Sequence, residues 1–242
     1  MIQDIIHSEW IDHVQHLSDA SVDLFYVDPP FNTGKVQSAK AGAYQDSWAT
    51  TDDWVEWFTQ RIQATIPKIK QAGSLLIHVD WRTSHRVRVV LDELLGESCF
   101  VNHLVWRYGL GGSSPRRFAR KHDDILFYCI DPKLYYFEPP MVPATSNRMK
   151  GQLKKATDVI DIPTLNNMAE ERVGYPTQKP LALLKLLVGA CCPEQGTVFD
   201  PCCGSGTTLV AAQELGRSYI GCDRSIDAIN TAHARLVSQR SS

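Results

Sequence analysis

Apolar residues follow two patterns along this chain: short continuous runs, and longer segments in which they recur at helical spacing. The runs predict buried strands at residues 22–27, 74–79, 101–108, 125–130, 197–199 and 219–222. The clearest helical segment is 84–95, with apolar residues at i, i+3, i+4, i+7 and i+8, Ser84 as the N-cap and Gly96 as the stop.

Three further segments predict helices by the same reasoning. Residues 52–66 open with two acids, which suit a helix N-terminus. Pro180 suits a first helical position and precedes an apolar stripe, and residues 207–215 end before Gly216. Strands that alternate with such helices predict a doubly wound α/β sheet, and 242 residues fit a single domain, 1–242.

Two polar segments show no clear periodicity. We expect residues 32–50 to form a mobile loop and residues 131–172 to form an inserted region. Loops of this length usually carry function or motion, and the alternative is a disordered connection.

Charge and cysteine content narrow the class of protein. The formal net charge is -2, so any surface for nucleic acid must be local. The seven cysteines include two adjacent pairs and no CxxC spacing, which argues for reduced thiols and against a disulfide framework or a metal site. The N-terminus lacks a signal-peptide pattern, and no run of about 18 apolar residues occurs, so we expect a cytoplasmic protein without a membrane partner.

The predicted strand at 22–27 is followed directly by an acid and a rigid diproline segment. It ends before Asp28, which is followed by Pro29 and Pro30 and then by the aromatic ring of Phe31. Proline locks φ and lacks an N–H, so an acid, a backbone carbonyl and an aromatic face are held in fixed relation. Taken alone, the pattern also fits a strand with a diproline turn.

A second motif lies downstream, at residues 197–225. A strand ends in Asp200, a Gly-x-Gly turn opens a helix, and the next strand ends in Asp223, which is the layout of a nucleoside-binding βαβ unit. The turn lacks the third glycine of the dinucleotide fingerprint, and Asp200 would repel a pyrophosphate. The motif therefore favours a cationic or amine-bearing ligand.

Together the motifs resemble those of the S-adenosylmethionine-dependent DNA amino-methyltransferases, specifically the permuted β-group, in which the catalytic motif precedes the cofactor motif. The similar segments are DPPFNTG at 28–34, GYPTQKPLALLKLLV at 174–188 and FDPCCGSGTTLVAAQELGRSYIGCD at 199–223. Ribosomal RNA and protein-glutamine methyltransferases carry similar motifs in the opposite order. The resemblance implies a Rossmann-like methyltransferase sheet with circularly permuted motif order and a short inserted target-recognition region, about 131–172.

The resemblance implies transfer of a methyl group from S-adenosylmethionine to the N6 amine of an adenine flipped out of duplex DNA. Asp28 and the Pro29 carbonyl would accept hydrogen bonds from the amine, and Phe31 would stack on the base. Asp before Pro-Pro favours adenine, with cytosine-N4 as the alternative. Two other classes stay open: a non-catalytic cofactor-binding regulator or DNA-binding subunit, and an RNA methyltransferase.

The resemblance also implies a set of cofactor-binding residues. It comprises Glu9, Asp28, Lys179, Asp200, Pro201, Cys202, Gly204, Gly206, Thr207, Thr208 and Asp223. Asp223 would bind the ribose, and Glu9 would meet the adenine amine of the cofactor. Lys179 also fits a solvated lysine before a helix. Cys202 stands where the family commonly has Phe, which predicts a lower affinity for the cofactor.

Two segments without acids supply local positive charge for DNA phosphates, residues 101–122 and 139–157. Such runs are also common on solvated faces. With the segment after the catalytic motif, they predict DNA contacts by Asn32, Lys35, Tyr44, Arg107, Arg116, Arg117, Arg120, Lys121, Arg148, Lys150, Lys154 and Lys155. The short recognition region leaves room for a homodimer, and the resemblance for a cognate restriction endonuclease.

Overall fold

The computed structural model describes residues 2–39, 42–109, 113–144, 148, 150–166 and 168–239. Its strands are β1 (Gln3–His7), β2 (Val22–Val27), β3 (Lys35–Ala39), β4 (Gly42–Asp46), β5 (Ile69–Val79), β6 (Phe100–Arg107), β7 (His122–Cys129), β8 (Met141–Pro143), β9 (Leu153–Lys155), β10 (Val159–Asp161), β11 (Thr197–Asp200) and β12 (Ser218–Asp223). Its helices are α1 (Trp10–Val14), α2 (Thr51–Thr65), α3 (Ser84–Leu95), α4 (Leu181–Cys191), α5 (Thr207–Glu214) and α6 (Ile226–Gln239), with 3-10 turns at Ile66–Lys68 and Glu97–Cys99.

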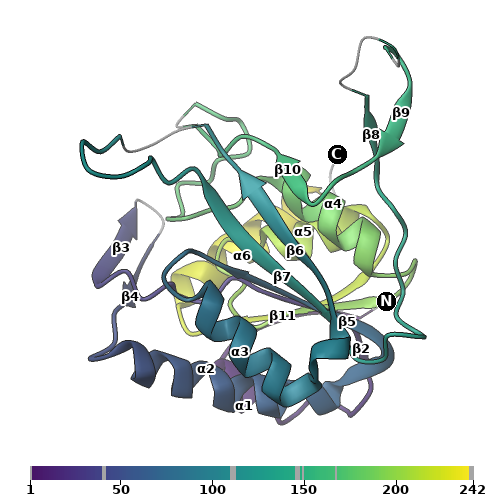
Figure 1. Ribbon diagram of the computed structural model, residues 1–242. Helices are drawn as coiled ribbons and strands as arrows, with labels where there is room; N and C mark the ends of the chain where they lie inside the picture. Colours follow the sequence, from purple (N-terminus) through teal and green to yellow (C-terminus); the bar gives the residue numbers. More distant parts are fainter. Residues whose placement is uncertain are drawn as a thin grey trace.

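The main sheet has eight strands in the order β1-β12-β11-β2-β5-β7-β6-β10 (Figure 1). Neighbouring strands pair in parallel except at β7, which runs antiparallel to both β5 and β6. The chain passes from β2 to β5 on one side and later fills β11 and β12 on the other, so the strand order switches between β2 and β11. Open α/β sheets bind their ligands at such a switch point, outside the carboxyl ends of the strands.

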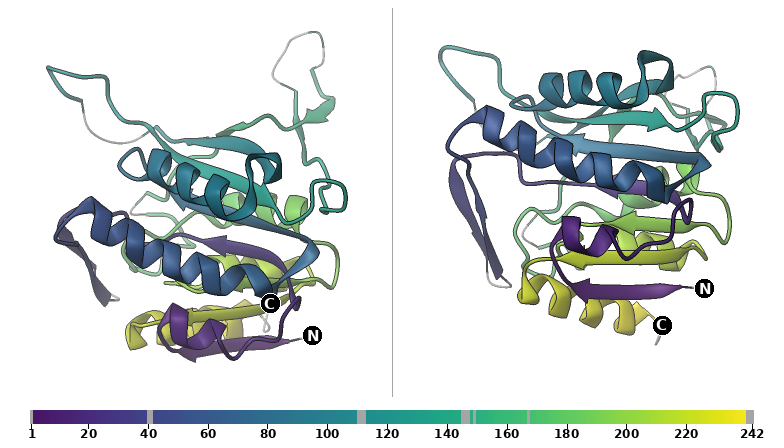
Figure 2. Two further views of the ribbon diagram at one scale, coloured as in Figure 1. Left: turned by 60° about the horizontal axis from the view of Figure 1, so that its bottom comes forward. Right: turned by 90° about the horizontal axis from the view of Figure 1, so that it is seen from below.

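Helices cover both faces of the sheet (Figure 2). On one face α2 and α3 bury Phe58 and Leu91, and on the other α4 and α5 bury Leu184 and Leu209. Because both faces are covered, every residue of β2 is buried and the strand reads as a continuous apolar run. The predicted doubly wound α/β class is confirmed.

The regular elements agree with the periodicity except at several boundaries and at weakly patterned segments. Each predicted strand is present, but β1, α1 and α6 were not predicted; β1 is an edge strand with mostly exposed residues, so it shows no apolar run. Two cap assignments were wrong. Thr83, not Ser84, is the N-cap of α3, and Pro180 is the N-cap of α4 rather than its first helical residue.

The two segments expected to be irregular contain regular structure. Within 32–50, β3 and β4 pair as an antiparallel hairpin, so the prediction of a plain loop was wrong; residues 40 and 41 lie outside the described residues. Within 131–172, β8 and β9 form a second hairpin and β10 joins the main sheet beside β6. Residues 145–147, 149 and 167 of that segment are outside the described part of the chain. Both segments thus form strands by pairing with other strands, although their sequences show no clear periodicity.

Candidate active site

One pocket lies at the switch point of the sheet. Asp28 follows β2, Asp200 ends β11 and Asp223 ends β12, and these parallel strands finish at the same edge. The pocket encloses about 860 Å³ of empty space including its open mouth. Nearly all of the predicted cofactor set lines it: Glu9, Asp28, Lys179, Asp200, Pro201, Cys202, Gly204, Thr207, Thr208 and Asp223.

The two carboxylate oxygens of Asp28 have different surroundings. Oδ2 forms an ion pair with Lys179, whose side chain is 10% exposed while that of Asp28 is 21% exposed. Oδ1 is buried and has no hydrogen-bond partner among the described residues. Leaving a buried acceptor unsatisfied costs about 1–3 kcal/mol, and more when the group is charged. Oδ1 is therefore an acceptor available to a donor on a ligand.

Phe31 is half-buried beside this pocket and is not part of its wall. Its ring centroid is 6.1 Å from that of His78, and Lys179 Nζ lies 5.3 Å from the Phe31 centroid. Trp54 Nε1 donates to the Pro30 carbonyl at 2.7 Å. With φ locked in both prolines, this bond determines the direction in which Phe31 leaves the strand.

Asp46, at the end of β4, holds the turn after Phe31. It is 2% exposed, and its carboxylate accepts from the Asn32 backbone N–H at 2.7 Å and from the Thr33 hydroxyl at 2.6 Å. Asn32 has φ 56, a conformation that Asn tolerates better than most residues. Its side-chain oxygen accepts from the Trp48 N–H at 3.1 Å. Asn32, predicted to contact DNA, thus has a supporting position in this turn; no sequence signal pointed to Asp46.

Asp200 lies at the floor of the pocket and is 2% exposed. Burial raises its pKa to about 7, and the nearby charge of Asp28 adds to the effect. Hydrogen bonds from the Thr208 hydroxyl and from the Cys202 N–H, the latter at 3.1 Å, act in the opposite direction. A cation bound beside Asp200 would favour its ionised form. The pocket therefore suits a ligand with a positive charge.

The two glycines of the Gly-x-Gly turn have different roles. Asp223 accepts the Gly204 N–H at 2.9 Å, and burial raises the pKa of Asp223. Gly204 has φ 50, and a Cβ there would lie 3.2 Å from the Tyr175 ring at the pocket wall. Gly206 has φ 75, but a Cβ there would lie 2.7 Å from Cβ of Ala232 in α6. Gly206 is not among the residues that line the pocket, and its cofactor contact stays a prediction; in the structure it allows α6 to pack closely.

Glu9 closes the pocket from the end of β1. Its Oε2 accepts the Trp10 N–H at the start of α1 and pairs with Arg61, each at 3.2 Å. Because both contacts use Oε2, Oε1 is the oxygen that can meet a ligand. The sequence resemblance was the sole basis for choosing Glu9, and the structure brings it to the predicted pocket.

A family model described as DNA methylase, of the N6/N4 methyltransferase type, matches residues 22–234. The chain belongs to this DNA methylase family. Membership confirms that the chain is a DNA methyltransferase with S-adenosylmethionine as its methyl donor. Among curated relatives, the type II methyltransferase M.HpaI of Haemophilus parainfluenzae is 29% identical over 99% of this chain and 76% of its own length. The DNA adenine methyltransferase YhdJ of Escherichia coli K12 is 26% identical over 96% of this chain and 82% of its own length.

Solved structures of methyltransferases share the fold of this DNA methylase. The M1.HpyAVI complex with S-adenosylmethionine superimposes with a TM-score of 0.68, at 22% identity, over 98% of this chain and 99% of that one. The cytosine-N4-specific PvuII DNA methyltransferase gives a TM-score of 0.74 at 14% identity, over 98% of this chain and 86% of its own. The predicted Rossmann-like methyltransferase sheet is therefore confirmed.

Aromatic residues from distant parts of the methylase chain complete the pocket. Tyr44, predicted to contact DNA, lies in the pocket wall with its hydroxyl 3.3 Å from Thr177 Oγ1. Burial raises the pKa of Tyr44 well above its ordinary value. Tyr175 and Trp57 also line the pocket and were not predicted. They supply aromatic area near Cys202.

A buried polar chain lies behind Asp28 in the methylase. The Tyr26 hydroxyl is 2.9 Å from His78 Nδ1, His78 Nε2 is 3.2 Å from Asp123, and the Tyr108 hydroxyl donates to Asp123 at 3.0 Å. Burial raises the pKa of Asp123, but the hydrogen bonds from His78 and Tyr108 and the charge of Lys179 outweigh burial and leave it low. No local sequence signal joins these residues, because strand pairing alone brings them together.

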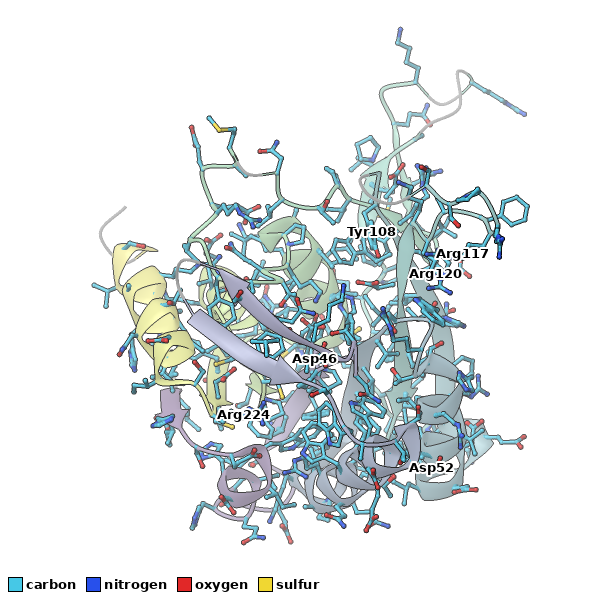
Figure 3. The ribbon with its side chains drawn as sticks, turned by 90° about the vertical axis from the view of Figure 1, so that its left-hand side faces the viewer. Asp46, Asp52, Tyr108, Arg117, Arg120 and Arg224 are labelled. Atoms are coloured by element: carbon cyan, nitrogen blue, oxygen red, sulfur yellow. The ribbon has the colours of Figure 1, made fainter. Side chains whose placement is uncertain are left out.

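The first basic segment of the methylase lies at the edge of the sheet that carries Asp28. β7 is antiparallel to β5, so the residues before His122 meet the carboxyl end of β5. Figure 3 shows Arg117 and Arg120 near Tyr108, on the side of the molecule that also presents Asp46. Arg107 forms an ion pair with Asp161, which offsets part of its charge. The rest of this predicted set is exposed or partly exposed: Arg116, Arg117, Arg120 and Lys121.

The second basic segment lies elsewhere. β7 ends at Cys129 beside Ser74, at the amino end of the last stretch of β5, and the β8–β9 hairpin that follows projects away from the β3–β4 hairpin (Figures 1 and 2). Arg148, Lys150, Lys154 and Lys155 belong to this hairpin region. The structure therefore does not bring them together with Asp28. Lys35 is exposed at the start of β3, on the active-site side.

Membrane-spanning helices, metal sites and cysteines can be assessed for the described residues. None of their helices is long and apolar enough to cross a membrane. Within the same ranges, no group of three or more His, Cys, Asp or Glu side chains is arranged to hold a metal ion. All seven cysteines are free thiols, and burial raises the pKa of Cys202 far above its ordinary value.

Proposed function

We propose that this chain transfers a methyl group from S-adenosylmethionine to the N6 amine of an adenine flipped out of duplex DNA. The observation that carries the proposal is the buried, unpartnered Oδ1 of Asp28, one residue after β2 and at the rim of a pocket lined by acids. An exocyclic amine has N–H groups to donate and a lone pair delocalised into the base. An acceptor that holds such an N–H favours the tetrahedral nitrogen from which the lone pair can attack.

The pocket residues fit the methyl donor by charge. S-adenosylmethionine supplies an electrophilic methyl group on a sulfonium, and it also carries an ammonium group. Asp200, whose burial disfavours its ionised form, would gain most from a cation, so we place the ammonium there. Asp223, held by two backbone N–H groups, would accept from the ribose hydroxyls, and Glu9 Oε1 would accept from the adenine amine.

Lys179 and Phe31 complete the assignment on the side of the target base. Lys179 pairs with Oδ2, which leaves Oδ1 to accept an N–H of the target amine. The amine loses one proton during the reaction, and Asp28, whose Oδ1 accepts the amine N–H, takes this proton and releases it to water. Phe31 offers a ring face for the flipped base, and stacking of that kind is worth about 1–3 kcal/mol.

Adenine is proposed over cytosine on two grounds. The chain has Asp rather than Ser before Pro-Pro, and YhdJ, which aligns over 96% of it, is named a DNA adenine methyltransferase. The likeness to the cytosine-N4-specific PvuII enzyme is at 14% identity, which supports the shared fold and not the target. Cytosine-N4 transfer is the second candidate, because Asp28 and Phe31 would serve either exocyclic amine.

The direct test identifies the methylated nucleoside. The protein is incubated with S-adenosylmethionine carrying a labelled methyl group and with unmethylated duplex DNA, and the DNA is digested to nucleosides. N6-methyladenine is the expected product, and N4-methylcytosine would move the proposal to the second candidate. Label in structured RNA but not in DNA would refute a DNA substrate, and no label in either would favour a non-catalytic regulator.

An Asp28→Asn variant serves as the matched control. It keeps the size and hydrogen-bonding oxygen of the side chain but loses the negative charge that pairs with Lys179. Methyl transfer should fall by at least about 100-fold, the usual contribution of a positioned polar catalytic group, while cofactor binding stays measurable. Activity close to that of the unaltered protein would refute the role of Asp28.

Two partner assignments are also proposals. M.HpaI is named a type II methyltransferase, which supports a search for a cognate restriction endonuclease with the same recognition sequence. The small recognition region supports a homodimer. Mass measured by light scattering, with and without DNA, tests the dimer.

A further inference from the structure

The loop between β6 and β7 leaves the sheet at the same edge as Asp28. β6 and β7 pair from Phe100↔Tyr128 to Arg107↔His122, and Val79 at the end of β5 pairs with Asp124. Residues 113–121 therefore project from the carboxyl end of β5, beside the strand that leads to the active site. Figure 1 shows this loop extending past the main sheet on the side of the β3–β4 hairpin.

Phe118 lies in this loop and is 97% exposed, the largest exposed fraction among the large apolar side chains of the described residues. A fully exposed aromatic ring has its apolar area in water and lacks packing that would hold it there. Single exposed apolar residues are common on proteins, so exposure alone assigns no role. The neighbouring charges decide which partner fits.

Cations surround Phe118 in the sequence and in space. Arg116, Arg117 and Arg120 are exposed, and none of them forms an ion pair with a carboxylate within the described ranges. Arg120 lies with its guanidinium carbon 3.2 Å from the centroid of the Trp81 ring, two residues after the end of β5, and this contact anchors the end of the loop. Figure 3 shows Arg117 and Arg120 close together on the side of the molecule that also presents Asp46. A ring presented among arginines suits a polyanion that also offers flat apolar surfaces.

We propose that Phe118 is a wedge that enters duplex DNA next to the flipped base, while Arg116, Arg117 and Arg120 contact the flanking phosphates. Proteins that distort DNA insert apolar side chains between base steps, and the inserted group offsets part of the stacking that is lost. A base can reach Asp28 only after it leaves the stack, which is when such an offset is needed. This inference rests on the proposed DNA methyl transfer.

The test compares Phe118→Ala with a matched control, Val89→Ala, on unmethylated duplex DNA. Val89 is also exposed, at 55%, but it lies on α3. For F118A, we expect kcat/KM for duplex methylation to fall by at least about tenfold, while nonspecific duplex affinity changes less than about threefold because the arginines remain. For V89A, both values should stay within about twofold of the unaltered protein, as for most surface changes.

A second measurement detects the wedge without turnover. Nicked plasmid is sealed by ligase in the presence of excess protein and S-adenosylhomocysteine, and the topoisomers are separated; an inserted side chain unwinds the duplex and shifts their distribution. The unaltered protein and V89A should shift it and F118A should not. Equal shifts for F118A and V89A, no shift with the unaltered protein, or equal duplex methylation by both variants would overturn the proposal.

The two proposals fail in different ways. If the unaltered protein methylates no DNA, the proposed function fails, and the ligation result still reports on Phe118 by itself. If it methylates DNA and F118A equals V89A, the wedge alone is refuted. Light scattering without DNA compares the molecular mass of F118A with that of the unaltered protein. A lower mass for F118A would show that Phe118 packs against a second copy of the chain, which also overturns the wedge.

Discussion

Asp200 is a buried carboxylate whose ionised form costs the folded protein stability when no cation is bound beside it. Asp200 is 2% exposed, and this burial raises its pKa from 3.8 to about 7. The unfolded chain ionises it near 3.8 and the folded protein near 7, so the penalty grows as pH rises between these values and is constant above them. At 1.36 kcal/mol per pH unit, the penalty above pH 7 is about 4 kcal/mol, an upper bound for a buried group.

Replacing Asp200 by Asn should therefore stabilise the ligand-free protein. The amide oxygen retains the bond from the Cys202 N–H, and the ionisation cost disappears. The gain in the free energy of unfolding should approach about 4 kcal/mol at pH 8 and fall to about 2 kcal/mol at pH 5, where folded Asp200 is already protonated. Titrating groups that do not interact with Asp200 cancel in the difference between the two proteins.

Urea unfolding followed by tryptophan fluorescence at pH 8 and pH 5 measures both gains. The unaltered protein and Asp200→Asn should be compared without cofactor, because a bound cation would stabilise the carboxylate and hide the effect. A variant less stable than the unaltered protein at pH 8, or a gain that does not depend on pH, would refute the burial argument.

Three further predictions follow from the same geometry. Cofactor affinity should rise about tenfold from pH 6 to pH 8, as the pKa of about 7 places the ionisation of Asp200 between them, and calorimetry on Asp200→Asn should show no such rise. Cys202→Phe should restore an aromatic face to the pocket and strengthen the free energy of cofactor binding by about 0.5–1.5 kcal/mol. Unchanged affinity would mean that Tyr44, Tyr175 and Trp57 already supply that face. Arg116→Ala with Arg117→Ala should reduce the steepness of log K for duplex DNA against log salt by about 2, whereas Arg148→Ala with Lys150→Ala, on the far hairpin, should change that steepness little. The reverse ranking would contradict the placement of the two basic segments.

The sequence by itself determined the class of fold and the position of the site along the chain. Buried strands such as β2 are apolar throughout, and α3 shows helical spacing, so both could be read from local pattern. Asp28, Asp200 and Asp223 each follow or end a predicted strand. Since parallel strands end at one edge of a sheet, the motifs were enough to predict that these three acids lie near one another.

Tertiary structure decided the contacts that depend on which strands are neighbours. The pairing of Lys179 with Asp28 joins residues 151 positions apart, and the chain from Tyr26 through His78 to Asp123 exists because β5 lies between β2 and β7. Two basic segments that look alike in sequence lie at opposite ends of β7, which is antiparallel to β5. The segment before β7 therefore lies at the active-site edge of the sheet, and the segment after β7 lies away from it. Local sequence carries no record of strand order or direction, because these depend on the packing of the whole chain.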